Sequence, residues 1–309
     1  MQVNHVFILA AGKGTRMGSI GKVLPKLLWP VFEIPLLDLQ VRFSMKHFPG
    51  ARISINTYNY SELIKSHVNK SSYRDSVDLV VEKETLDIGG AIHNMAKRKD
   101  YEGLAAILNG DQFLMLDQTE IEKGIESASR STACLLGYRV NSNQLYNALS
   151  FNQKGKLETI RPNSDIARNT SMVTYTGNSF INLSRLRPTE GESKFFDSIA
   201  NPELDEVNVE VLADLEYWDF GTLNRYHKSH FDLLMSKSLF FDFLTQEKAI
   251  DRNKLKDRSY HSLSGINLAE NFQDYLGAET IALSELAPSI AKEDPRKRII
   301  FNDRVELLP

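Results

Sequence analysis

The clearest candidate for chemistry is a glycine-rich run, LAAGKGTRM, which spans Leu9–Met17 and follows an apolar segment. Gly12 and Gly14 carry no side chain, so the backbone N–H groups of a turn at this place can approach phosphate oxygens closely. Arg16 can grip such oxygens with its planar guanidinium group, and Lys26 can bring a mobile positive charge to a reacting phosphorus. The run therefore predicts a cradle for phosphate groups.

Two familiar phosphate-binding loops do not match this run. A dinucleotide-binding loop requires G-x-G-x-x-G, but Met17 stands at the last position and the next glycine is Gly18. A Walker loop requires G-K-S or G-K-T to close the turn, and neither triplet occurs here. The remaining alternative is a tight strand-to-helix turn with two incidental basic residues.

Two aspartates far apart in the sequence are candidate metal ligands. Asp111 ends the apolar run LAAILNGD, and Asp219 precedes the glycine turn of EYWDFGT. A carboxylate at the C-terminal end of a central strand faces the crevice in which α/β sheets bind ligands. Mg2+ prefers such oxygen ligands, and one ion held by both aspartates could bridge two phosphate-bearing substrates. On its own, N-G-D is also a common turn sequence, which leaves a purely structural role open for Asp111.

The elements that must position these residues alternate between strand and helix patterns. Strand-like runs occupy residues 5–11, 52–58, 77–82 and 104–111, with helical patterns between them. Val6 to Ala11 are apolar on consecutive residues, as in parallel strands covered on both faces. The apolar residues in 36–48 fit both the alternation of a strand and the spacing of a helix. Their place between two predicted strands favours a helix. The alternation predicts a doubly wound, Rossmann-like α/β sheet.

From about Thr132 the strands follow one another closely, which predicts an antiparallel lobe beside the parallel sheet and a ligand cleft between the two. We expect residues 1–240 to form the domain that carries the site and residues 241–309 a C-terminal extension. No hexapeptide period occurs in the extension, so a long left-handed β-helix is not expected. Three roles stay open for it: docking on the core, self-association into a homo-oligomer, or capping of the cleft.

The string AAGKGTRM with a following PK resembles the signature of the sugar-phosphate nucleotidyltransferases, over about Val3 to Leu234. The resemblance implies that Arg16 and Lys26 bind a triphosphate and stabilise the transition state. It also implies a glycosyltransferase-A-like fold, in which a mixed, mostly parallel sheet carries an antiparallel sugar-binding lobe. The chain departs from the common pattern in GSIGKVLPK, where Leu27 follows in place of a second proline.

Two further motifs occur in the order expected for this family. NGD and WDFGT resemble its two metal-binding elements, which implies that Asp111 and Asp219 hold Mg2+. Tyr217 fits the usual aromatic position of the second element, and Trp218 stands between it and the aspartate.

The segment ETLDIGGAI is similar to the family's E-T-G-G-G-I type segment, with Asp87 and Ile88 in place of the usual Glu and Thr. Gly89 and Gly90 at a helix start would let a base or sugar lie against the backbone. The nucleotide-binding residues predicted in this way are Leu9, Ala11, Gly12, Gly14, Thr15, Arg16, Glu82, Gly89 and Gly90.

The acceptor side is predicted from the segment TYTGNSFIN, which resembles the family's sugar-contacting T-x-x-G-I strand. Asn178 stands where an apolar residue is usual. Many members have a second phosphate-binding lysine in E-K-P before this strand, and TIRPN offers Arg161 as a substitute. The predicted sugar-phosphate residues are Asn109, Arg161, Gly177 and Asn178.

The resemblance implies transfer of a nucleoside monophosphate from an NTP to a sugar 1-phosphate, with Mg2+ as cofactor and pyrophosphate as product. It is nearest to mannose-1-phosphate guanylyltransferases and N-acetylmuramate-1-phosphate uridylyltransferases, and the sequence does not decide between GTP and UTP, nor exclude CTP or dTTP. Glu82 could accept hydrogen bonds from guanine, or lie exposed in solvent. Two alternatives remain: cytidylyl transfer to phosphocholine or another alcohol phosphate, and a catalytically silent, sugar-nucleotide-binding regulatory subunit.

Composition excludes several other classes of protein. The formal net charge of -3 over 309 residues provides no general field for nucleic acid. No apolar run has the length of a membrane helix, so we expect no membrane partner and a cytoplasmic location. Cys134 is the single cysteine, which excludes an intramolecular disulfide. His227 and His230 have metal-binding spacing on a helix, but without a further ligand we expect both to be solvated.

Overall fold

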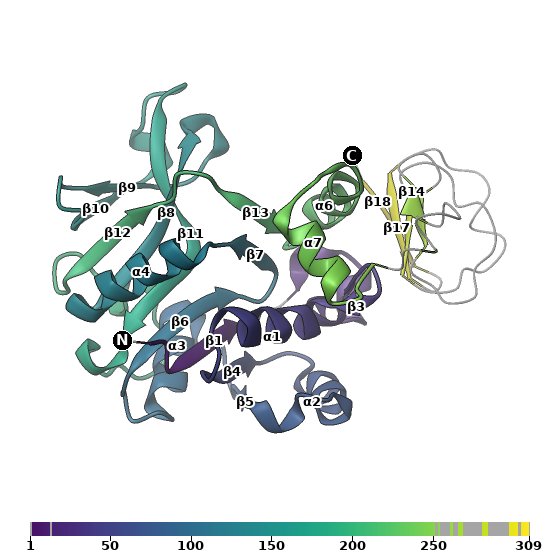
Figure 1. Ribbon diagram of the computed structural model, residues 1–309, viewed down its shortest axis with the longest axis horizontal. Coiled ribbons are helices and arrows are strands. Elements are labelled where there is room, and N and C mark those ends of the chain that lie inside the picture. The colour runs from purple at the N-terminus through teal and green to yellow at the C-terminus, as the bar shows by residue number, and fades with distance from the viewer. Residues whose placement is uncertain are drawn as a thin grey trace.

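The computed structural model describes residues 2–12, 14–250, 253, 260–261, 265–267, 280–283, 297–301 and 304–308. Seven strands form the central sheet, in the order β12-β8-β11-β6-β1-β4-β5 (Figure 1). All neighbouring strands are parallel except at β11, which is antiparallel to both β6 and β8. The fold is therefore the expected mixed, mostly parallel α/β sheet. The strands are β1 His5–Leu9, β4 Arg52–Thr57, β5 Val77–Val81, β6 Leu104–Asn109, β8 Ala133–Asn141, β11 Ser171–Asn182 and β12 Val207–Val211.

Both faces of the sheet are covered, as the consecutive apolar residues of β1 predict. Val6 and Ile8 belong to one buried cluster with α1 and α4, whereas Phe7 belongs to a second cluster with α3 and α5. This alternation follows from the two-residue period of a strand. The ambiguous segment at residues 36–48 forms a helix, as expected from its position. The helices are α1 Leu36–His47, α2 Ser61–Lys70, α3 Asp87–Lys97, α4 Gln118–Arg130 and α5 Phe195–Ser198.

The strands after Thr132 continue the central sheet through β11, which supplies its antiparallel part. A hairpin of β9 (Ala148–Phe151) and β10 (Leu157–Arg161) lies beside β11 and is a sheet of its own. Two further antiparallel pairs, which include strands from earlier in the chain, form separate sheets. They are β2 Pro30–Val31 with β3 Ile34–Pro35, and β7 Gln112–Met115 with β13 Glu216–Asp219. Cys134 on β8 is buried, and burial raises the pKa of its thiol to about 12.

Helices α6 (Leu223–Met235) and α7 (Leu239–Gln246) follow the sheet. Residue 240, expected as a domain boundary, lies inside α7. Phe240 is fully buried, with its ring centroid 4.5 Å from that of Phe113 on β7. The helix therefore packs into the same core as the strands that precede it.

The described part of the extension contains five short strands in one sheet beside α6 (Figure 1). Three of them, β15, β16 and β17, are parallel, and the outer two are antiparallel to their neighbours. Contacts with α6 and with the loop after β1 show that this sheet docks on the core. The strands are β14 Tyr260–His261, β15 Gly265–Asn267, β16 Thr280–Ala282, β17 Arg298–Phe301 and β18 Arg304–Leu307. No helix in the described ranges is long and apolar enough to cross a membrane.

The histidines of α6 are buried, so the prediction that they are solvated is wrong. His230 is fully buried. Its Nδ1 lies 2.8 Å from the carbonyl oxygen of Tyr226, and the backbone nitrogen of Phe32 donates to its Nε2 at 3.4 Å. This arrangement fits a neutral ring with the proton on Nδ1. Burial lowers the pKa of His230 to about 4, which keeps the ring neutral at physiological pH. One aromatic partner of His230, Phe32, comes from a distant part of the chain, and the local helical spacing does not reveal this contact.

Candidate active site

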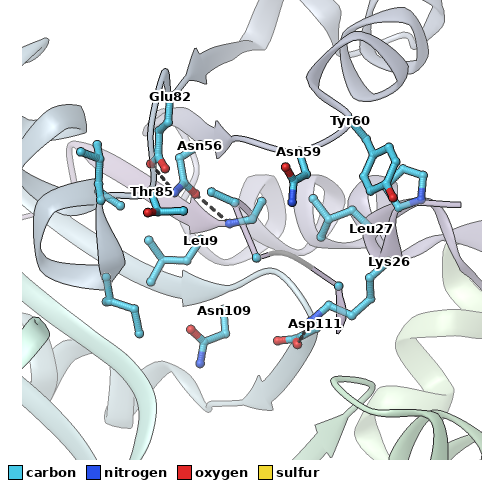
Figure 2. A pocket seen from close by; sticks show the side chains of 18 of the residues that line it. Leu9, Lys26, Leu27, Asn56, Asn59, Tyr60, Glu82, Thr85, Asn109 and Asp111 are labelled. Atoms are coloured by element: carbon cyan, nitrogen blue, oxygen red, sulfur yellow. Dashed lines mark hydrogen bonds and ion pairs between the residues drawn. The ribbon is translucent and has the colours of Figure 1, made fainter. Parts of the chain in front are cut away.

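A cleft of about 490 Å³ lies at the carboxyl ends of β1, β4 and β6. Figure 2 shows its two ends: Glu82, Asn56 and Thr85 gather at one, and Lys26 and Asp111 at the other. Most of the predicted nucleotide-binding residues line this cleft. Those that do are Leu9, Ala11, Gly12, Gly14, Arg16 and Glu82, together with Lys26, Asn109 and Asp111.

The glycine-rich loop has the open backbone that an anion cradle requires. A Cβ added at Gly12 would meet no atom within 4 Å, so the backbone there is accessible from the cleft. Gly14 has φ 65, a left-handed conformation that favours glycine, and its carbonyl oxygen accepts the Met17 N–H at 2.9 Å. Met17 is fully buried and anchors the turn, while Arg16 is exposed at the cleft. The side chain of Thr15 lies outside the described part of the structure.

Lys26 contacts the first predicted metal ligand at its end of the cleft. Its Nζ donates to Asp111 Oδ2 and forms an ion pair with it. Lys26 begins a short 3-10 turn after Pro25, and the buried Leu27 side chain packs close to Gly110. The leucine that replaces the family's second proline therefore supports the strand end that carries Asp111.

The two predicted metal ligands converge although they are far apart in sequence. Strands β7 and β13 pair antiparallel, and the Phe220 N–H donates to the Asp111 carbonyl oxygen at 2.9 Å. A Cβ added at Gly221 would lie 2.8 Å from Asp111 Oδ2 and 2.9 Å from Asp219 Oδ1. The two carboxylate oxygens therefore lie within 3 Å of one point, and a side chain at Gly221 would fill the space between them.

This donor set suits a hard divalent cation that is shared with substrate. Within the described ranges, no three His, Cys, Asp or Glu side chains gather closely enough to hold a metal by themselves. Mg2+ commonly takes one or two carboxylates and completes its six ligands with water and substrate phosphate oxygens. Asp111 and Asp219 fit that pattern, with Asp111 on the cleft wall and Asp219 directly behind it.

Arg225 was not found from the sequence, yet it lies beside this pair of carboxylates. Its Nη1 donates to Asp219 Oδ2 at 2.7 Å, and its Nη2 donates to the Tyr146 hydroxyl at 3.4 Å. The guanidinium group is nearly half exposed, whereas Asp219 is largely buried. Arg225 stands in a polar helical sequence with no motif around it, so only the fold reveals its position.

A second group that the sequence reasoning missed is Asn56, at the far end of the cleft. Its Oδ1 accepts the Ala10 N–H at 2.7 Å, and its Nδ2 donates to Glu82 Oε1 at 2.7 Å. The backbone donor fixes the orientation of the amide, so Glu82 must act as acceptor. Glu82 is 6% exposed, and burial raises the pKa of its carboxyl group, although the bond from Asn56 opposes this. The position of Asn56 near the carboxyl end of β4 is a signal that could have identified it.

Gly89 and Gly90 are not among the residues that line the cleft. A Cβ at Gly89 would collide with the Lys194 carbonyl oxygen, and a Cβ at Gly90 with that of Gly191. The absence of side chains allows α3 to pack against the segment before α5. The residues of this region that line the cleft are Thr85, Leu86, Asp87, Ile88 and Ala91.

The predicted sugar-phosphate residues are dispersed. Gly177 has φ 89, and a Cβ there would collide with the Asn109 side chain, so this glycine shapes the cleft floor indirectly. Asn178 is 3% exposed and Arg161 is exposed, with its Nη2 donating to the Asp165 carbonyl oxygen at 3.0 Å. Neither side chain lines the cleft.

Sequence comparison identifies relatives of this chain. It is 29% identical over 150 residues to D-glycero-alpha-D-manno-heptose 1-phosphate guanylyltransferase of Campylobacter jejuni. The matched region covers 48% of this chain and 64% of that protein. It is 31% identical over 208 residues to bifunctional protein GlmU of Acinetobacter baumannii, which covers 67% of this chain and 44% of that protein. The chain thus spans about half the length of the curated relatives it matches.

Solved structures support the same fold. HddC from Yersinia pseudotuberculosis, complexed with GMP-PN, is similar with a TM-score of 0.59 and 23% identity, over 74% of this chain and 98% of that chain. A UDP-glucose pyrophosphorylase complexed with UDP-glucose is similar with a TM-score of 0.58 and 16% identity, over 74% of this chain and 97% of that chain. The nucleotidyl transferase family matches residues 5–236, which include every residue of the cleft described above. The chain belongs to the nucleotidyl transferase family.

Proposed function

We propose that this protein transfers a nucleoside monophosphate from an NTP to a sugar 1-phosphate, with Mg2+ as cofactor and pyrophosphate as product. The observation that carries this proposal is the convergence of Asp111 and Asp219 beside Lys26, at one end of a cleft that begins at the glycine-rich loop. The name of one relative, a heptose 1-phosphate guanylyltransferase, agrees with a sugar phosphate as acceptor.

The reaction needs no protein nucleophile. The glycine-rich loop and Arg16 bind the triphosphate, and Lys26 lies beside the α-phosphorus. An oxygen of the acceptor phosphate attacks the α-phosphorus, and the bond to the pyrophosphate oxygen breaks with the negative charge leaving on pyrophosphate. Asp111 and Asp219 would hold Mg2+, which offsets phosphate charge when bound. Positioning and electrostatic stabilisation account for most of the rate in such transfers.

For the acceptor phosphate we propose Arg225 in place of Arg161. Arg225 binds one carboxylate oxygen of Asp219, and the other oxygen of that carboxylate lies at the point where Asp111 and Asp219 converge. A planar guanidinium group can bind two phosphate oxygens at once. We expect Arg225→Ala to raise the KM for the sugar 1-phosphate about ten-fold, with a smaller change in the KM for the NTP. Steady-state pyrophosphate release with each substrate varied in turn measures both values.

Arg161→Ala is the matched control for this prediction, because Arg161 is an exposed arginine outside the cleft. It should leave both KM values unchanged. The assignment is contradicted if Arg161→Ala raises the acceptor KM and Arg225→Ala does not.

For the nucleotide base we propose guanine. Guanine presents two N–H donors on one edge, and the Glu82 carboxylate has free acceptor capacity beyond its bond from Asn56. Uracil offers one N–H between two carbonyl oxygens, which suits an amide better than a carboxylate. Solved structures complexed with UDP-glucose and with GMP-PN share the fold, so the fold alone does not select the base, and we assign the selection to Glu82.

The variant Glu82→Gln tests this choice. We expect the ratio of kcat/KM for GTP to that for UTP to fall about ten-fold at neutral pH. In the wild type the KM for GTP should rise as the pH falls towards the raised pKa of Glu82, because the protonated carboxyl group loses acceptor capacity. The variant should lack this pH dependence. An unchanged GTP preference together with an unchanged pH profile would remove Glu82 from base recognition.

The general test is pyrophosphate release from the four NTPs, each combined with a panel of sugar 1-phosphates and with phosphocholine. Release with one sugar 1-phosphate pair supports the proposal and identifies the substrates. Release with phosphocholine and CTP alone would favour the cytidylyltransferase. Tight sugar-nucleotide binding without release would favour the regulatory subunit. The cytoplasmic location and a homo-oligomeric state stay predictions.

A further inference from the structure

The last strand of the described chain, β18, reaches the loop that follows β1. The backbone N–H of Ser19 donates to the Glu306 carboxylate, and Arg304 Nη1 donates to the Ser19 carbonyl oxygen at 3.5 Å. Arg304 and Glu306 are two residues apart on a strand, so their side chains project from the same face. One face of β18 therefore contacts both polar backbone groups of Ser19.

The Glu306 carboxyl group also packs directly on Gly18. A Cβ added at Gly18 would collide with all three atoms of that carboxyl group. Gly18 has φ 60 and ψ -150, a conformation that residues with a side chain rarely adopt. Position 18 thus requires glycine both for the backbone conformation and for the approach of Glu306.

The backbone that Glu306 contacts separates two parts of the loop that line the cleft. Arg16 lies on one side of Gly18–Ser19 and Gly21 on the other. The turn after Ser19 brings Gly21 against Gly14, since a Cβ at Gly21 would lie 2.8 Å from the Gly14 carbonyl oxygen. A shift of the Gly18–Ser19 backbone would therefore move both Arg16 and the glycine turn of the predicted phosphate cradle.

Strand β18 is itself fixed to the core. It pairs antiparallel with β17, in which Ile299 and Ile300 are fully buried. β17 contacts α6, the helix that follows the Asp219 turn. The C-terminal sheet therefore contacts both the helix that follows Asp219 and the backbone that follows the glycine-rich loop.

We propose that Glu306 is a positioning residue for nucleotide binding. It does not touch the nucleotide; it holds the Gly18–Ser19 backbone, and through it Arg16 and the glycine turn, in the conformation that accepts the triphosphate. This gives the C-terminal sheet a role in the reaction at the N-terminal loop. The inference rests on the proposed function, because it takes that loop as the triphosphate site.

The test compares Glu306→Ala with Glu306→Gln in the full chain. Gln keeps an oxygen that can accept the Ser19 N–H, whereas Ala has none. We expect Glu306→Ala to raise the KM for the NTP about five-fold, with kcat and the KM for the sugar 1-phosphate changed by less than about two-fold. Glu306→Gln should recover most of this loss. Leu307→Ala, at the adjacent and exposed position of the same strand, is the matched control and should behave as the wild type.

Titration calorimetry with GTP and with UTP separates this inference from the proposed function, because it needs no turnover. If the wild type binds an NTP and Glu306→Ala binds it equally well, the inference is overturned while the proposed function stands. An equal rise in both KM values together with a lowered Tm would make Glu306 a structural residue only, and would also overturn the inference. A wild type that neither binds nor converts any NTP overturns the proposed function itself.

Discussion

Replacing Asp111 by Asn is expected to lower kcat for pyrophosphate release roughly 10²- to 10³-fold while the fold is retained. Asn keeps the shape of the side chain but removes the charge that faces both Lys26 and the space shared with Asp219. If this carboxylate holds Mg2+, higher Mg2+ concentrations should restore part of the lost rate. Initial rates over a range of Mg2+ concentrations, with circular dichroism to verify folding, measure both effects.

Asp214→Asn is the matched control, because Asp214 is an exposed aspartate five residues before Asp219 in the sequence. It should leave the rate and its Mg2+ dependence unchanged. A wild-type rate for Asp111→Asn would remove Asp111 from the mechanism, and with it the main support for a shared metal site.

Replacing Lys26 by Met is expected to lower kcat about 10²-fold, with a smaller effect on the binding of the NTP. Met is of similar length but uncharged, so the variant tests charge rather than packing. Lys26 forms its ion pair with Asp111 inside the cleft, where a positive charge can follow the developing charge on the phosphate groups. Single-turnover rates and NTP titrations on the same preparation separate the chemical step from binding.

Lys22→Met serves as the control in the same loop. The Lys22 side chain is exposed, and only the backbone of this residue is bonded to Tyr60, whose hydroxyl donates to the Lys22 carbonyl oxygen at 2.8 Å. The variant should keep the wild-type rate. Equal losses in the two lysine variants would point to a general loss of positive charge around the cleft and would contradict a specific role for Lys26.

The sequence could predict those parts of the site that depend on local chemistry. Gly12 and Gly14 could be placed in an open turn because they directly follow an apolar strand and carry no side chain. Asp111 could be placed at the cleft because the carboxyl ends of parallel strands share one edge of the sheet. Consecutive apolar residues in β1 were sufficient to predict a central strand covered on both faces.

Other features depended on pairings between distant segments, and local patterns misled at these positions. Gly89 and Gly90 have the spacing of a ligand-binding helix start, yet α3 uses them to pack against residues 191–194. Arg161 has a motif-like context but lies on an exposed hairpin, whereas Arg225 has no motif and lies beside Asp219. His230 has metal-ligand spacing and is buried among aromatic side chains.

By itself, then, the sequence determined the class of fold and identified the glycine-rich loop and the two aspartates as candidate site residues, since each follows from residue type and position within one element. Only the tertiary structure decided that Asp219 meets Asp111, because this requires β13 to pair with β7 across a hundred residues of intervening chain. It also decided that Glu306 contacts the loop at Ser19. Local periodicity describes which face of an element is buried, but contacts between faces arise from packing, and packing is a property of the whole chain.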